Sequence, residues 1–258
     1  LLAVFEFVPS VLIMAAILLV ILIGVVIGMP SGLPVGRKDA KFTEVFAKNR
    51  NINWLSVARL FLFGARDVWF VVGIPIYFYA VLSDGSTDGN RAAFFMIGTF
   101  MAVWTILYGI VQGSAPRILR AASRTDVKML ALAKHWVGLL IIVPAFLAGL
   151  VWLVPEPSNA LTATIVLGLL AFGGIFAVNS ALHSFLILSF TDAKRVTMDV
   201  GFYYMANAAG RLVGTVMSGV TYQFGGLPLC LAAAAIMIGL SWLGVSQLKP
   251  HEHSKVPA

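Results

Sequence analysis

Seven stretches of this sequence are long and apolar enough to cross a lipid bilayer, since a spanning helix needs about 20 mostly apolar residues. They occupy residues 8–29, 52–82, 92–111, 133–154, 160–190, 200–222 and 227–248. Of the 258 residues, 60% are hydrophobic and 11% are charged, whereas about 25% of the residues of a soluble domain are charged. The sequence therefore predicts an all-α integral membrane protein with seven transmembrane helices.

The rest of the composition excludes several other classes of protein. Cys230 is the only cysteine, which excludes a disulfide scaffold, and the apolar excess excludes disorder. In so apolar a chain, the net charge of +7 indicates orientation in a bilayer rather than binding of nucleic acid. There is no nucleotide-binding Gly-x-x-x-x-Gly-Lys run and no His or Cys cluster with metal-ligand spacing. We therefore expect no cofactor, no metal, no nucleic-acid partner and no enzymatic activity.

The basic residues predict how the helices are oriented. Loops on one side of the predicted bundle hold fourteen of them: Arg37, Lys38, Lys41, Lys48, Arg50, Arg117, Arg120, Arg124, Lys128, Lys134, Lys194, Arg195, Lys249 and Lys255. The loops on the other side hold only Arg91. Because Lys and Arg concentrate in cytoplasmic loops, the C-terminus is predicted to be cytoplasmic. Seven crossings then place Leu1 on the outer side.

The positions of the predicted spans and loops divide the chain into four parts. A start at Leu1, with neither methionine nor a basic signal-peptide region, predicts the C-terminal part of a longer protein. We expect a last helix of an N-terminal half at 1–29, a central cytoplasmic loop at 30–51, a six-helix bundle at 52–248 and a cytoplasmic tail at 249–258. Two six-helix bundles joined by a cytoplasmic loop are typical of the major facilitator superfamily. The expected partners are membrane lipid and the N-terminal half of the same transporter.

Three arginines, Arg59, Arg66 and Arg211, lie inside the predicted spans. Buried arginine is costly in a bilayer and usually faces a polar cavity or a partner. Guanidinium groups bind phosphate-like oxygens bidentately, so these three residues predict a small-molecule anionic substrate with several oxygens. Two alternatives stay open. Arg59 snorkels to the inner interface, or Arg66 or Arg211 pairs with Asp67, or with a carboxylate of the missing half, and locks helices together.

Two titratable side chains inside the spans are candidates for proton coupling. Asp67 is the only carboxylate well inside the six-helix bundle, and it is either a proton-coupling site or a static partner of Arg211. As neighbours on a helix, Arg66 and Asp67 are predicted to point about 100° apart and not to share a direction. His183 either relays protons or is a hydrogen-bonded core histidine.

A row of polar residues completes the candidate substrate-binding site. Tyr203, Asn207 and Arg211 are spaced by four, so they lie on one face of the helix at 200–222. Hydroxyl, amide and guanidinium groups in a row are typical of the wall of a solvated cavity. Asn179 on the preceding helix is a further candidate, with an interhelical hydrogen bond, worth about 0.6 kcal/mol, as the alternative.

Two runs of sequence resemble a known family. Residues 53–73 read NWLSVARLFLFGARDVWFVVG, and residues 201–212 read GFYYMANAAGRL. Together with Tyr222-Gln223 at the end of that helix, they resemble the ArsJ-type organoarsenical efflux permeases of the major facilitator superfamily. The resemblance implies export of 1-arseno-3-phosphoglycerate across the bacterial inner membrane, and hence arsenate resistance. It also implies a functional link to glyceraldehyde-3-phosphate dehydrogenase, which forms that compound when it uses arsenate in place of phosphate.

Three other interpretations stay open. The first is a superfamily exporter of another organic anion or of a drug. The second is a seven-helix receptor, which shares the topology, although the span at 227–248 has no lysine for a retinal Schiff base. The third is a membrane-embedded enzyme, for which one carboxylate and one histidine on different helices would be a thin catalytic set.

Overall fold

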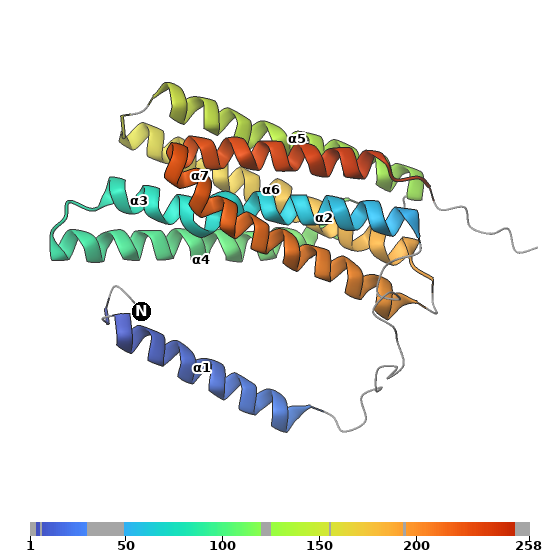
Figure 1. Cartoon of the computed structure of the whole chain (residues 1–258), viewed down its shortest axis with the longest axis horizontal. Helices are drawn as coiled ribbons and strands as arrows, with labels where there is room; N and C mark the ends of the chain where they lie inside the picture. Colours follow the sequence, from blue (N-terminus) through green and yellow to red (C-terminus); the bar gives the residue numbers. More distant parts are fainter. Residues whose placement is uncertain are drawn as a thin grey trace, which may run out of the picture.

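The fold is described by a computed structural model of the chain (Figure 1). The residues that it describes are 4–5, 7–29, 49–119, 125–154, 156–192 and 195–250. The elements are α1 (Phe7–Gly28), α2 (Arg50–Val68), a π-helix (Trp69–Gly73), α3 (Ile74–Leu82), α4 (Thr87–Ile118), α5 (Asp126–Leu153), α6 (Asn159–Phe190) and α7 (Val196–Ser246). The described residues contain no strand, so the all-α prediction is confirmed.

Six helices of the described part of the chain are long and apolar enough to cross a membrane. The segment Arg50–Leu82, which runs through α2, the π-helix and α3, counts as one of them. This confirms the prediction of a multi-pass membrane protein. The predicted central loop up to residue 48 and the tail from residue 251 lie outside the described residues.

α7 is too long to be one straight spanning helix. Its 51 residues would extend about 76 Å, against about 30 Å for the hydrocarbon core. The backbone leaves helical geometry at Gly225 and Gly226, and the φ of 61° at Gly226 is one that only glycine adopts readily. Figure 1 shows the chain reversing there and returning beside α5. This kink separates the residues predicted as the spans 200–222 and 227–248.

Side-chain caps and end contacts fix where several helices begin and end. Asn49 caps α2 by accepting the amide of Asn51 at 2.8 Å. The side-chain amide of Asn49 also donates to the Phe190 carbonyl at the end of α6. Asn51 exchanges two hydrogen bonds with the backbone of Lys249, just after α7. The start of α2 and the ends of α6 and α7 therefore meet at one end of the bundle.

The core of the bundle is the crossing of α2 and α7, where glycines bring the two backbones together. A Cβ atom at Gly210 would overlap the Leu60 carbonyl, and one at Gly214 would overlap the backbone of Gly64. Gly210 and Gly214 are four apart, the spacing of small residues that lets membrane helices pack closely. This contact places Arg211, the residue after Gly210, against the middle of α2.

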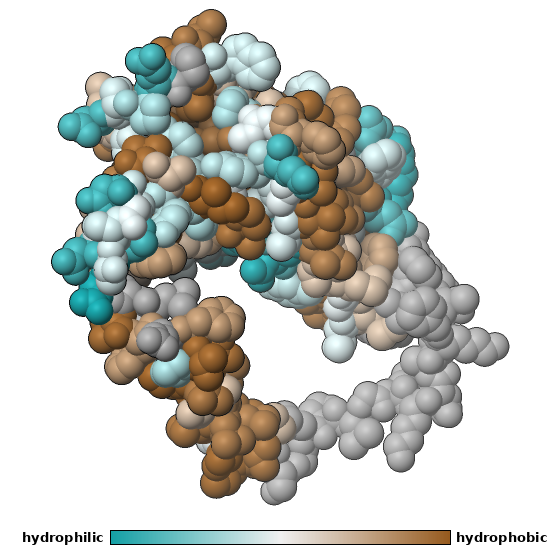
Figure 2. Space-filling model, turned by 60° about the vertical axis from the view of Figure 1, so that its left-hand side comes forward, coloured by the Kyte–Doolittle hydropathy of each residue, from teal (hydrophilic) through white to brown (hydrophobic). Residues whose placement is uncertain are grey.

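α1 lies apart from the other helices, as Figures 1 and 2 show. Its most apolar window contains no buried residue. The surface that Figure 2 shows for it is almost uniformly hydrophobic. In water such a helix would not be stable as a separate element, whereas contact with lipid satisfies an all-round apolar surface.

Candidate functional site

Two groups of polar side chains lie inside the otherwise apolar bundle. The Arg59 cluster consists of Arg59 of α2, Tyr108 and Gln112 of α4, and Ser180 of α6. The Asp67 cluster consists of Arg66 and Asp67 of α2 and Arg211 of α7. Polar groups buried in a membrane protein face a cavity or one another, so the contacts within each cluster decide what it can do.

Arg59 lies in the interior of the bundle and is only 4% exposed. Its Nη1 donates to the carbonyl and to the hydroxyl of Ser180, both at 3.2 Å. Its guanidinium lies 3.9 Å from the centre of the Phe63 ring and 4.9 Å from that of Tyr203. The alternative that Arg59 snorkels to the interface is therefore wrong, because packing against α6 and two aromatic rings encloses it.

Ser180 joins three helices through its hydroxyl. Besides Arg59, this oxygen has the Tyr108 hydroxyl at 3.3 Å and the Gln112 side-chain amide at 3.1 Å. Tyr108 and Gln112 were missed in the sequence, although two polar residues four apart in an apolar helix are a detectable signal. The hydroxyl of Ser180 thus makes the kind of interhelical hydrogen bonds that polar side chains form in membrane proteins.

Asp67 is 1% exposed and is shared by two arginines. Its Oδ1 accepts from Nε of Arg66 at 2.6 Å, with Nη2 at 2.5 Å. Its Oδ2 accepts from Nε of Arg211 at 3.0 Å. The prediction that Arg66 and Asp67 do not share a direction is wrong, because the long arginine side chain bends back around its own helix. The alternative that Asp67 pairs with Arg211 is the arrangement found.

Aromatic rings surround Arg66. Its guanidinium carbon lies 5.4 Å from the centre of the Phe63 ring, 6.0 Å from that of Phe70 and 5.8 Å from that of Phe176. Phe63 also lies under Arg59, so one ring contacts both cations. Ring faces attract cations most strongly where water is excluded, so these contacts stabilise both guanidiniums in the interior.

The two clusters contain more positive than negative charge. They hold three arginines and one carboxylate, and among the described residues the ion pairs of these arginines all involve Asp67. Arg59 has only neutral hydrogen-bond partners there. Asp199, in the first turn of α7, is the other buried acid of the described bundle, and its side chain accepts a hydrogen bond from Thr191 at the end of α6. An uncompensated positive charge inside a membrane bundle favours binding of an anion.

The remaining candidate residues are dispersed. Asn179 donates to the carbonyl of Trp136 in α5, which is the interhelical hydrogen bond named as its alternative, and to that of Ile175 in its own helix. His183 is fully buried, and neither ring nitrogen has a hydrogen-bond partner among the described residues, so it is not a hydrogen-bonded core histidine there.

Along the predicted polar row of α7, the exposure of the side chains increases from Tyr203 to Arg211. Tyr203 is fully buried beneath Arg59, Asn207 is half-buried, and the side chain of Arg211 is 56% exposed. The row therefore runs from Tyr203, buried at the Arg59 cluster, to Arg211 of the Asp67 cluster, whose side chain the other helices of the described chain leave largely uncovered.

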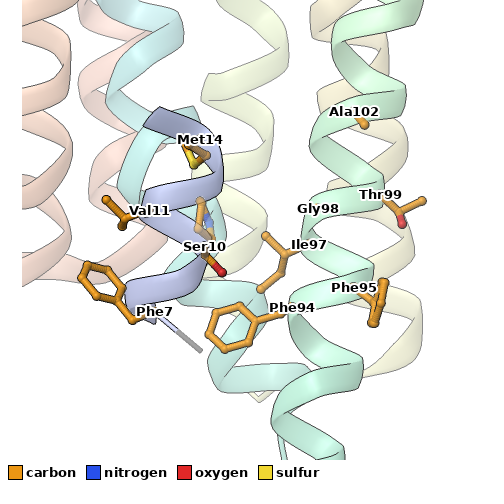
Figure 3. Close-up of a pocket in the computed structure, with 11 residues that line it drawn as sticks. Phe7, Ser10, Val11, Met14, Phe94, Phe95, Ile97, Gly98, Thr99 and Ala102 are labelled. Atoms are coloured by element: carbon orange, nitrogen blue, oxygen red, sulfur yellow. The ribbon is translucent and has the colours of Figure 1, made fainter. Parts of the chain in front are cut away.

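A large cavity lies elsewhere, between α1 and the α3–α4 region (Figure 3). It has a volume of about 750 Å³, and its walls include Phe7, Met14, Pro75 and Phe94. Ser10 and Thr99 are its only hydroxyl side chains. None of the arginines lines it, so its size does not make it the site for an anion.

Comparisons with known proteins do not assign the chain to a family. No protein-family model matches the chain, and searches of curated proteins and of solved structures find no match. In the described residues, no group of His, Cys, Asp and Glu could hold a metal ion. The case for a function therefore depends on the two clusters and on the resemblance given by residues 53–73 and 201–212.

Proposed function

We propose that the chain belongs to a secondary active transporter that exports an organic anion. One observation supports this most strongly: the two clusters hold three arginines and one carboxylate, and that carboxylate, Asp67, pairs with only two of the arginines. A drug exporter for cations would place carboxylates in its cavity rather than arginines. Arginine is suited to the role because its planar donors match the oxygens of a phosphate-like group.

The proposed fold is the C-terminal half of a major facilitator superfamily transporter. In this proposal α7 crosses the membrane twice, before and after the kink at Gly225 and Gly226, and α2 to α7 form six spans. α1 is the last helix of the N-terminal half, which completes the transport pathway. In this proposal the protein lies in the inner membrane of a bacterium with its C-terminus in the cytoplasm, an orientation that the basic loops support.

The proposed cargo is 1-arseno-3-phosphoglycerate. The resemblance to the ArsJ-type permeases suggests it, and its phosphate, arsenate and glycerate oxygens suit the arginines of both clusters. Export of this compound would remove arsenate from the cell after glyceraldehyde-3-phosphate dehydrogenase has incorporated it. His183 is the proposed proton-coupling residue, since a buried titratable group without a hydrogen-bond partner among the described residues can change its protonation during transport. For Asp67 we adopt the alternative of a static partner of Arg211.

Growth in arsenate tests this function in cells. A bacterium that lacks its own arsenic exporters would express the complete gene, and its arsenic content and growth would be compared with those of an empty-vector strain. We expect resistance that disappears when glyceraldehyde-3-phosphate dehydrogenase is depleted. Resistance that is independent of the dehydrogenase would indicate a different anion, and no resistance from a protein shown to be in the membrane would contradict the proposal.

A further inference from the structure

The three arginines are held in different ways, and from this we infer a division of roles that rests on the proposed function. Arg211 is the arginine that binds the substrate oxyanion, through its two terminal nitrogens. Asp67 is a positioning residue that holds Arg211 by its Nε. Arg66 neutralises Asp67, so that the carboxylate positions Arg211 without cancelling its charge.

Arg211 has the free hydrogen-bond donors. Only its Nε bonds to Asp67, at 3.0 Å. A guanidinium has five N–H donors, of which Nε carries one. The four donors on Nη1 and Nη2 have no hydrogen-bond partner among the described residues, and the side chain is 56% exposed. These two nitrogens form the edge of the fork that binds two oxygens of one oxyanion at the same time.

Arg66 is held much more tightly. Two of its nitrogens engage the same Asp67 oxygen, the rings of Phe63, Phe70 and Phe176 surround its guanidinium, and its side chain is 13% exposed. Leaving this site would expose the buried Asp67 to an apolar environment without its nearest cation, which is strongly unfavourable. Arg66 therefore stays in place while a ligand binds to Arg211.

The backbone next to Arg211 is fixed as well. Gly210 lies against the Leu60 carbonyl, and Gly214 against the backbone of Gly64, so the backbones of α7 and α2 are in close contact at this level. The direction of the Arg211 side chain is then set by its bond to Asp67, one turn along α2 from Gly64. Asp67 thus determines where the terminal nitrogens of Arg211 point.

The charges of the Asp67 cluster predict how substitutions combine. The wild-type cluster has two cations and one anion, a formal charge of +1. Arg66→Gln leaves Asp67 and Arg211 as a neutral pair, in which the carboxylate competes with the substrate for Arg211. Arg66→Gln with Asp67→Asn restores +1 and keeps an oxygen at position 67 that can accept from Arg211. Arg211→Gln with Asp67→Asn also has a charge of +1, carried by Arg66, but it lacks the exposed fork.

The test is the apparent KM for arsenic uptake by everted vesicles that contain the full-length protein. The arsenylated product is made outside the vesicles by glyceraldehyde-3-phosphate dehydrogenase, and its concentration is varied through arsenate. Removing one unit charge near a ligand in a partly buried site changes affinity by about tenfold. We expect Arg66→Gln to raise KM about tenfold with little change in kcat, and the double substitution Arg66→Gln/Asp67→Asn to return KM to within about threefold of wild type.

Arg211→Gln/Asp67→Asn is the matched control and should not recover. Rescue of both double variants would show that only net charge matters, and would overturn the role of the Arg211 fork. Failure of Arg66→Gln/Asp67→Asn to recover, with normal amounts of protein in the membrane, would overturn the role given to Arg66. No uptake by wild type would overturn the proposed function itself, and this inference with it, so the two failures can be told apart.

Discussion

Asp67 of α2 accepts a hydrogen bond from Arg211 of α7 at 3.0 Å, although the two residues are 144 positions apart in the chain. The contact depends on the close crossing of α2 and α7 at Gly210 and Gly214. Since Arg66 occupies the other carboxylate oxygen, both oxygens of Asp67 are bonded. Burying an ionised carboxylate costs free energy, and removing one of its two arginine partners raises that cost further. Mutations in the cluster and mutations at the helix crossing should therefore both affect the contact between Asp67 and Arg211.

The helix crossing is predicted to tolerate no side chain at Gly210. Gly210→Ala places a methyl group against the Leu60 carbonyl, and overpacking of this kind costs about 3 kcal/mol. Gly219→Ala on the same helix is the control, because no atom lies within 4 Å of its new Cβ and alanine is the better helix former by about 1 kcal/mol. Thermal unfolding in detergent should show a lower midpoint for Gly210→Ala and an unchanged or higher one for Gly219→Ala. Equal midpoints would contradict the crossing.

Ser180 is predicted to be a structural hub of α2, α4 and α6. Ser180→Ala removes an oxygen to which Arg59, Tyr108 and Gln112 are bonded, and unpaired buried donors cost about 2 kcal/mol. The matched control is Thr164→Ala, since that hydroxyl bonds only to its own helix at an exposed position. The unfolding midpoint should fall for Ser180→Ala alone. A fall of similar size in both variants would contradict the hub.

The π-helix beside the Asp67 cluster is predicted to depend on Ser218. The hydroxyl of Ser218 accepts the amides of Val72 and Gly73, both at 3.2 Å, within a segment where i→i+5 bonds replace the regular bonds of an α-helix. Ser218→Ala should accelerate amide hydrogen exchange at these two positions about tenfold, the equivalent of about 1.4 kcal/mol. Thr105→Ala, which removes a hydroxyl bonded within α4, should leave their exchange unchanged. Unaltered exchange in Ser218→Ala would show that the hydroxyl is dispensable.

The positions of the spans could be predicted from sequence because hydrophobic length alone determines them. The predicted stretches fall in α1, in α2 to α3, and in α4, α5, α6 and α7. The π-helix at Trp69–Gly73 could not be predicted, since it depends on a hydroxyl 145 residues away from Gly73. The burial of Arg59 could not be predicted either, because its hydrogen-bond partner, Ser180, is on another helix far along the chain.

The sequence predicted the charged residues of the candidate site, but it did not predict which of them contact one another. Helix periodicity predicted that Arg66 and Asp67 point in different directions, because it treats side chains as straight vectors from the helix axis. An arginine has several rotatable bonds, so Arg66 reaches the residue next to it. Asn179 was a candidate because it is a polar residue in an apolar span, whereas its side-chain amide donates to the Trp136 carbonyl of α5.

The central claim is most directly tested by arsenic uptake into energised everted vesicles that contain the full-length protein. The vesicles would receive arsenate, glyceraldehyde 3-phosphate and NAD, with or without glyceraldehyde-3-phosphate dehydrogenase, and the trapped arsenic would be measured. We expect accumulation that requires the dehydrogenase, because only then is 1-arseno-3-phosphoglycerate formed. Arsenic accumulation that is equal with and without the enzyme, or none in vesicles proven to be energised, would contradict export of this anion.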